Sequence, residues 1–439
     1  METAAGPAES RTIPVRPTTW SWARKGTLAI ADQGLITSSN FLVALMLARQ
    51  VSPAEYGAYA VSFEVFLLLA AVYLAFILEP ISIFGASTYK DCLREYFGSM
   101  LKNQAWVTVA TLLLVGSAAV AIHLAHGSQT LVSALAGVAV ASPCVLLFWI
   151  ARRAFYIHLA PGAALSGAVL YSSTLLIGLA VCSRKHVLSP LMVFVLMAAG
   201  AMVTSMVLLW KLKPTLVRSQ PLGEIVRRHW NYGCWALASA GASWAMSAVF
   251  YIAISGFHGL AASGEMRALM NLSAPAAQGF TAVSLLSLPY ASRIYDNRDP
   301  AEIRRLSLRL IALYAGGTAL YFAVVIGLGP LLLQLLYQGK YQSVAGLIPW
   351  LRLAMVLRIG ATAQALLLRA VQSPFLVFSA YGAATVVAVI AGIPATKLFG
   401  LKGAIAAMIA VGATALVVSS VLLRSRLRTI EPRGELQAA

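Results

Sequence analysis

Long apolar runs recur along the chain, each about as long as a helix that crosses a bilayer. They lie at residues 26–50, 57–84, 104–126, 128–150, 161–182, 187–210, 231–256, 265–291, 307–329, 345–369, 374–396 and 401–423. Runs of about 20 apolar residues span hydrocarbon as helices, because every backbone N–H and C=O must bond within its own segment. The runs do not alternate at every second position, which disfavours a barrel. The pattern predicts an all-α polytopic membrane protein with about 12 transmembrane helices.

A charged break divides these runs into two sets of six. The segment 211–230 holds five Lys or Arg residues and two prolines, and is too polar to span. We therefore predict five regions: an N-terminal tail (1–25), an N-lobe (26–210), a linker (211–230), a C-lobe (231–424) and a C-terminal tail (425–439).

The two sets look like repeats. The first helix of each set ends in a short turn, SPAEYGAYA in the first and GLAASGEMRA in the second, which makes Gly57 and Gly264 equivalent. Because six is an even number, both halves would enter the membrane from the same side. This is the parallel-repeat arrangement known among transporters.

Composition agrees with this class. Hydrophobic residues make up 59% of the chain and charged residues 11%, whereas soluble domains carry about 25% charged residues. Four cysteines and six histidines are scattered singly, so neither a disulfide framework nor a metal site is predicted. No phosphate-cradling glycine loop or nucleophile elbow is present. We predict neither an enzyme nor a bound cofactor.

The distribution of Lys and Arg predicts the orientation. With the N-terminus inside, the inside segments hold 24 of these residues and the outside segments 6. Cytoplasmic segments carry the excess, so both termini are predicted to be cytoplasmic. Basic residues facing anionic lipid head groups also account for the net charge of +18, and no nucleic-acid partner is needed.

Charged residues inside the predicted helices are the first candidates for function. Each would cost roughly 2.5 to 3.5 kcal/mol facing lipid at mid-depth, on the order of 15 to 20 kcal/mol in total, against a net stability of about 5 to 15 kcal/mol. Most must therefore face protein, water or one another. They are Asp32, Glu64, Glu79, Arg267, Arg352 and Arg358.

Helical spacing groups some of these residues. Arg267, Asn271 and Gln278 sit at i, i+4 and i+11 and form one polar stripe, which we expect to line a cavity. The same spacing recurs at Arg358, Thr362 and Arg369. Hydrogen bonds or buried ion pairs that only fix helix packing remain the alternative for each of these side chains.

Four segments carry a resemblance to a known family. They are SSNFLVALMLARQVSPAEYGAY (38–59), ARRAFYIHLAPGAALSGAVLY (151–171), LLYQGKYQSV (335–344) and FGLKGAIAA (399–407). In this order they resemble the polysaccharide and O-antigen flippases of the multidrug/oligosaccharidyl-lipid/polysaccharide (MOP) exporter superfamily.

The resemblance implies a fold and a function. Two six-helix lobes would surround a central cavity that opens alternately to each side of a bacterial inner membrane. The substrate would be an undecaprenyl-pyrophosphate-linked oligosaccharide for O-antigen, exopolysaccharide or capsule synthesis, with a polysaccharide polymerase and assembly proteins as partners.

Residue chemistry gives these expectations a candidate site. Guanidinium binds phosphate oxygens in a bidentate fork, and all three intramembrane cations are arginines, which favours an anionic substrate. The predicted substrate-binding residues are Arg267, Arg352, Arg358, Asn271, Gln278, Arg49 and Asn40. Arg49 is expected as a rim contact, and snorkelling to the interface is its alternative.

The intramembrane acids have a separate candidate role. Asp32, Glu64 or Glu79 could bind H⁺ or Na⁺ and couple transport to a gradient, with Asp32 as the first choice. Pairing with one of the arginines is the open alternative.

Other function classes remain to be weighed. A multidrug and toxin extrusion antiporter shares the architecture, but cationic drugs favour acids and aromatic residues in the cavity. A flippase for the peptidoglycan lipid precursor typically carries fourteen helices. A glycan polymerase or ligase is of another class, and it places its chemistry on a large outside loop. The predicted outside loops here reach only about 16 residues.

Overall fold

The computed structural model describes residues 19–428 apart from 86–87, 159, 217–220, 297–299 and 372. Residues 1–18 and 429–439 of the predicted tails, and 217–220 of the predicted linker, lie outside the described residues. The regular elements within the described ranges are all helical.

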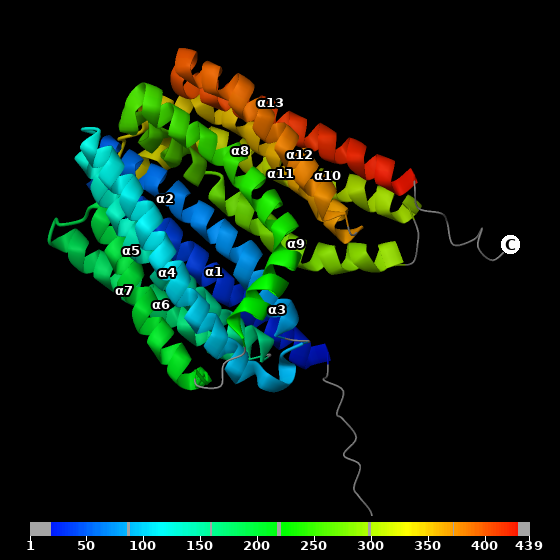
Figure 1. Cartoon of the computed structure of the whole chain (residues 1–439). Coiled ribbons are helices and arrows are strands. Elements are labelled where there is room, and N and C mark those ends of the chain that lie inside the picture. Colours follow the sequence, from blue (N-terminus) through cyan, green and yellow to red (C-terminus); the bar gives the residue numbers. More distant parts are fainter. Residues whose placement is uncertain are drawn as a thin grey trace, which may run out of the picture.

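The N-lobe contains the first half of the helices, coloured blue to green in Figure 1. Its α-helices are α1 (Thr19–Gln50), α2 (Pro53–Tyr73), α3 (Glu79–Phe84), α4 (Leu93–Leu124), α5 (Gln129–Ile157), α6 (Pro161–Arg184) and α7 (Pro190–Leu212). A π-helical turn, η1 (Leu74–Leu78), joins α2 to α3, and a short 3₁₀ helix, η2 (Lys90–Cys92), precedes α4. Helices α2, η1 and α3 therefore form one long passage across the lobe.

The C-lobe contains the second half and lies beside the first, from green to red in Figure 1. Its α-helices are α8 (Leu222–Asn271), α9 (Ala274–Asp296), α10 (Pro300–Tyr337), α11 (Ile348–Ala370), α12 (Pro374–Val387) and α13 (Ile393–Arg428). The short elements are η3 (Gln342–Leu347), a 3₁₀ helix, and η4 (Ala388–Gly392), a π-helical turn.

Twelve membrane passages are counted in the described chain, which confirms the predicted fold class. Ten continuous helical stretches are long and apolar enough to span, because two breaks lie inside helices. Gly259 has φ 83° within α8, and Gly400 has φ 58° within α13. Glycine adopts this left-handed backbone at little cost. The break at Gly400 divides its stretch into two passages, and the break at Gly259 ends one passage and begins another that continues into α9.

The turn after α1 shows how local sequence places these elements. The Ser52 side chain accepts a hydrogen bond from the Glu55 N–H (3.3 Å), and the Glu55 carboxylate accepts one from the Ser52 N–H (2.8 Å). This capping box satisfies two backbone donors at the start of α2. Pro53 follows at the first helical position, where its missing N–H costs nothing. The SPAEYG sequence thus ends one passage and starts the next.

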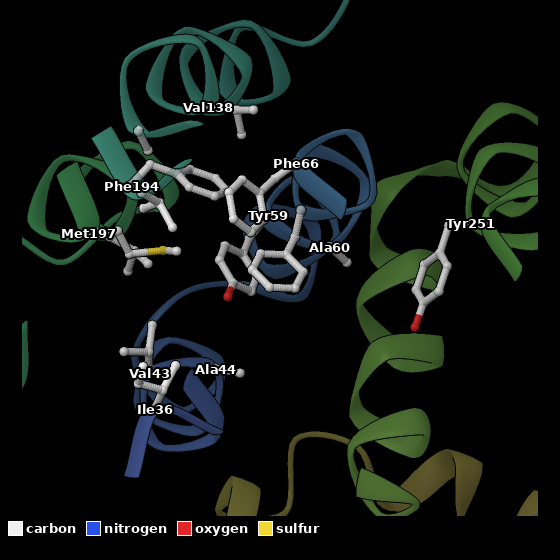
Figure 2. Close-up of a cluster of buried hydrophobic side chains, with 14 of the residues drawn as sticks. Ile36, Val43, Ala44, Tyr59, Ala60, Phe66, Val138, Phe194, Met197 and Tyr251 are labelled. Atoms are coloured by element: carbon white, nitrogen blue, oxygen red, sulfur yellow. The ribbon is translucent and has the colours of Figure 1, made fainter. Parts of the chain in front are cut away.

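The N-lobe core packs aromatic rings between α1, α2, α5 and α7. In Figure 2 the rings of Tyr59 and Phe66 meet Phe194, while Val138 lies above them. Tyr59 and Phe194 have ring centroids 5.4 Å apart, and both side chains are almost fully buried. Tyr251 of α8 stands apart from this cluster (Figure 2) and belongs to the opposite lobe.

Several helices are longer than the apolar runs that predicted them. Helix α4 begins at Leu93 where the apolar run begins at 104, and α10 spans Pro300–Tyr337 where the run spans 307–329. Charged and polar turns at a membrane surface can remain helical while their side chains reach water. Hydropathy marks the hydrocarbon-crossing part of such a helix and misses its ends.

The predicted linker is partly helical and anchored. Helix α8 begins at Leu222, inside the segment 211–230. Here His229 is buried, and its Nδ1–H donates to the Phe76 carbonyl in η1 (3.1 Å), while its Nε2 accepts from the Tyr96 hydroxyl (2.8 Å). Pro80, four residues after Phe76, has no N–H to donate to this carbonyl. His229 therefore ties the start of the C-lobe to the N-lobe.

Because His229 is part of this anchor, we expect the stability of the fold to fall in acid. Burial lowers the pKa of His229 to about 4, and the hydrogen bond to the Phe76 carbonyl opposes this only in part. Because the unfolded chain then binds the proton more tightly, stability is full above pH ~6.5 and falls as the pH drops toward ~4, by about 3 kcal/mol. Thermal unfolding across this pH range should show the loss. His229→Gln should abolish it, and the exposed control His123→Gln should retain it.

Candidate functional site

A cavity of about 1150 Å³ lies between the two lobes. The N-lobe contributes α2, η1 and α3, and the C-lobe contributes α8, α9, α11, α12 and α13. Along α2 the lining runs from Glu64 to Glu79, away from the turn at Pro53. Glu64 is 6% exposed, whereas Glu79 is an exposed residue. The cavity therefore has a buried floor at Glu64 and a mouth at Glu79, the end at which α1 begins.

An ion pair between the lobes forms the floor. The Arg267 guanidinium lies 3.4 Å from the Glu64 carboxylate and stands over the Phe63 ring, 4.8 Å from its centroid. The Trp244 indole N–H donates to the Glu64 carbonyl (2.8 Å). Because Arg267 is from the C-lobe and Glu64 from the N-lobe, the pair joins the lobes at the bottom of the cavity.

A short helical segment holds the floor residues in place. It runs from Leu260 to Asn271, between the break at Gly259 and a turn at Leu272 and Ser273. The Asn271 amide donates to the Tyr56 hydroxyl of the N-lobe (2.8 Å) and to the Tyr337 hydroxyl of α10 (3.3 Å). Asn271 thus contacts the cavity on one side and the packed tyrosines beyond the floor on the other.

Beyond the floor the lobes are tightly closed. A Cβ atom at Gly57 would lie 1.6 Å from the Leu260 carbonyl oxygen, and one at Gly264 would lie 2.4 Å from the Pro53 carbonyl oxygen. The two glycines that the repeat makes equivalent therefore pack against each other. Only residues without a side chain permit this approach of two backbones.

Two cations bridge the lobes at the outer edge of this closed end. Arg49 donates to the Leu336 carbonyl (2.7 Å) and the Leu335 carbonyl (2.6 Å). In return Lys340 donates to the carbonyls of Arg49 (2.5 Å) and Val51 (3.0 Å). Both cations satisfy carbonyls at helix ends, which attract positive charge.

Two further arginines line the cavity from α11. Arg358 lies near the floor and Arg369 near the mouth. Within the described ranges, neither guanidinium forms a hydrogen bond or a close ion pair. The charge of Arg358 acts on Glu64, and that of Arg369 acts on Glu79. The cavity therefore presents cations with unused hydrogen-bond donors.

Asp32 lies elsewhere, in the interior of the N-lobe. Its carboxylate is fully buried and bonded by the Arg152 guanidinium and the Tyr156 hydroxyl. The sequence pattern ended the fourth helix at 150 and assigned Arg152 to a loop, but α5 continues to Ile157. That extra length brings Arg152 and Tyr156, one turn apart, onto Asp32. The structure thus shows the open alternative for Asp32, pairing with an arginine.

The Asp32 pair predicts a large stability effect. Asp32→Asn would leave the Arg152 guanidinium, whose side chain is 11% exposed, without its counter-charge. Breaking a buried pair on one side costs about 3 to 5 kcal/mol. Tyr156→Phe removes only one hydrogen bond to a charged group and should cost about 1.5 to 3 kcal/mol. Thermal unfolding in detergent would test this order; equal effects of the two variants would contradict it.

The predicted site residues separate into two groups by location. The cavity is lined by Arg267, Arg358, Asn271, Gln278, Glu64 and Glu79. Outside the lining are Arg352, Arg49, Asn40 and Asp32. Arg352 is half-buried on α11 and Asn40 is half-buried on α1, while Arg49 is at the closed end. The cavity does not bring this second group together with the first.

The structure adds site residues that the sequence prediction left out. Arg369 lines the mouth, and it is the third member of the stripe that begins at Arg358. Trp244 and Phe63 support the floor pair. The helical spacing signalled Arg369, but only the tertiary fold brings Trp244 and Phe63 to Glu64 and Arg267.

Comparison with known proteins shows which solved structures share this fold. No protein-family model matches the sequence, and no curated protein matches it either. Among solved structures, the chain resembles an inward-facing multidrug resistance MATE family transporter of the MOP superfamily, with a TM-score of 0.75 and 13% identity over 92% of this chain and 98% of that one. This chain has a MATE-like fold.

Further solved structures of transporters share this fold, with lower TM-scores. An outward-facing MATE family transporter matches with a TM-score of 0.67 and 12% identity, covering 93% of this chain and 96% of that one. A MOP-superfamily transporter from Pyrococcus furiosus, described as having a binding pocket of reverse polarity, matches with a TM-score of 0.64 and 14% identity. The match again covers 93% of this chain and 96% of that one.

Proposed function

We propose that the chain is an alternating-access transporter that flips an anionic lipid-linked glycan, an undecaprenyl-pyrophosphate-linked oligosaccharide, across the membrane. The cavity mouth would face the cytoplasm in this state, because the predicted cytoplasmic segments and the start of α1 lie at that end. The membrane would be the bacterial inner membrane, and the released glycan would pass to a polymerase and assembly proteins for O-antigen, exopolysaccharide or capsule synthesis.

The charge of the cavity is the observation that carries this proposal. Three arginines and two glutamates line it, and Glu64 is already paired with Arg267. Arg358 and Arg369 keep free donors within the described chain. Guanidinium groups in a partly dehydrated cavity bind phosphate oxygens strongly, with charge-assisted hydrogen bonds. An anionic head group fits this lining, and a cationic one would meet a net positive charge.

Cavity size supports a large substrate. Pockets for drug-sized ligands measure about 300 to 1,000 Å³, and the cavity here is about 1150 Å³. Polar side chains such as Ser239, Ser243 and Gln278 lie beside the aromatic rings of Trp244 and Phe280 in its wall. Hydroxyl and amide groups can hydrogen-bond sugars, and aromatic faces can stack on sugar rings.

A multidrug antiporter is the second candidate, because the solved structures of this fold include multidrug resistance transporters. Such a function needs acids that are free to meet a cationic drug. Here Glu64 is bonded to Arg267, and two arginines act on Glu79. The lining therefore favours the flippase over the antiporter.

Coupling to a H⁺ or Na⁺ gradient is part of the proposal. Glu64 is the best placed of the three predicted acids, since it lies on the cavity floor in contact with Arg267. A proton fits this carboxylate better than Na⁺, because protonation releases Arg267 without adding a second cation beside it. Transport in vesicles should therefore respond to a pH gradient and ignore a sodium gradient; the reverse result would contradict this assignment.

A complementation experiment tests the proposed function in cells. Deleting the gene in its host should cause lipid-linked repeat units to accumulate on the cytoplasmic leaflet, and the native chain should restore surface glycan. Arg358→Gln should fail to do so, while Arg424→Gln, an exposed arginine outside the cavity, should succeed. Normal surface glycan in the deletion strain, together with new sensitivity to cationic drugs, would favour the antiporter instead.

A further inference from the structure

The charges in the cavity form the same pattern twice. At the floor, Glu64 of α2 is paired with Arg267, and Arg358 of α11 lines the same part of the cavity. At the mouth, Glu79 of α3 and Arg369 of α11 both line the cavity. Each cluster therefore contains one glutamate from the second passage of the N-lobe and one arginine from α11, and the floor cluster also contains Arg267. We call them the floor station and the mouth station.

The two stations lie far apart along the cavity. Arg358 and Arg369 are eleven residues apart on one helix, which corresponds to about 16 Å along its axis. Glu64 and Glu79 are separated by a comparable length of α2, η1 and α3. One pyrophosphate group is much too short to reach both arginines of α11 at once.

The exposure of the two stations differs. The floor pair is largely buried, because the side chain of Arg267 is 14% exposed and that of Glu64 is 8% exposed. Glu79 and Arg369 are exposed at the mouth, and Tyr232 lines the wall beside Glu79 with an exposed ring. The mouth station is thus accessible from the membrane surface, while the floor station is reached only through the cavity.

We propose that the mouth station is a second binding site for the pyrophosphate head group, and that it receives the anion before the floor station does. This inference rests on the proposed anionic substrate. Arg369, whose hydrogen-bond donors are free within the described chain, would first bind the phosphate oxygens. The head group then moves along α11 to Arg358 and Arg267, where it displaces Glu64. The head group thus passes from one arginine of α11 to the next, and at the floor the phosphate replaces the carboxylate on Arg267.

Counting bound ligands tests the two-station arrangement. The probe is geranyl pyrophosphate, titrated by calorimetry into the whole chain in nanodiscs of phosphatidylcholine. The native chain should bind two equivalents, and Arg369→Gln and Arg358→Gln should each bind one. The double variant should bind none, and the control Arg424→Gln should bind two. Glu79→Gln removes the competing carboxylate and should tighten the weaker site severalfold.

The other outcomes separate the two proposals. One equivalent on the native chain, with Arg369→Gln unchanged, would overturn the mouth station and leave the proposed function standing. No binding to any form would overturn both. Repeating the titration in nanodiscs that contain phosphatidylglycerol distinguishes the source of the anion. A drop from two equivalents to one there would show that the mouth station takes the head group of a bulk lipid, and would overturn its role in substrate capture.

Discussion

Arg267→Gln is expected to destabilise the chain by about 3 to 5 kcal/mol and to abolish transport. The variant leaves the Glu64 carboxylate buried and without its counter-charge, and the loss of one partner of a buried pair is costly. It also removes the contact of Arg267 with the Phe63 ring. Unfolding in detergent measures the first effect, and translocation in proteoliposomes measures the second.

The double variant Glu64→Gln/Arg267→Gln separates stability from transport. Two neutral side chains of similar size can hydrogen-bond each other, so most of the lost stability should return. Transport of an anionic substrate should stay absent, because the floor has lost one of its two cations, Arg267, and keeps only Arg358. A double variant as unstable as Arg267→Gln alone would show that the two residues do not act as a pair.

Gly57→Ala is expected to open the closed end. The added Cβ would lie 1.6 Å from the Leu260 carbonyl oxygen, so the two helices must separate by about 2 Å to reach ordinary contact. A carbonyl within a helix cannot turn aside, because its own hydrogen bond holds it. The packing of Gly57 on Gly264 would be lost, and with it the seal between the lobes.

Spin labels across the closed end measure this opening. Cysteines replacing the exposed Ala54 and Ala261, in a background without the four native cysteines, report the distance between the lobes. Gly57→Ala should lengthen and broaden the distance distribution. The matched control is Gly116→Ala, where an added Cβ meets nothing within 4 Å, and it should behave like the native chain. An unchanged distribution in Gly57→Ala would contradict the close packing.

The fold could be predicted from sequence because membrane burial leaves a simple signal. Apolar runs marked all twelve passages, including the discontinuous one that begins after Gly259 and ends in α9. The helix ends could not be predicted in the same way. Where α5 runs past 150 to Ile157, charged residues at the surface hide the helix from hydropathy while the backbone continues its hydrogen bonding.

The site could be predicted only where one helix carries it. Arg267 and Asn271 are one turn apart and both line the cavity. The spacing to Gln278 crosses the turn at Leu272 and Ser273, so its place in the lining depends on tertiary structure and not on helical phase. Asp32 and Arg152 are 120 residues apart, and the helical period says nothing about such a pair.

The loss or survival of charge selectivity in a flipping assay tests the central claim most directly. Proteoliposomes containing the chain would be given a fluorescent prenyl-pyrophosphate-linked disaccharide and, separately, a cationic dye of similar size. We predict translocation of the anionic lipid alone, lost in Arg358→Gln and kept in Arg424→Gln. If the native chain transported the cationic dye and did not translocate the pyrophosphate lipid, the result would contradict an anion-binding cavity.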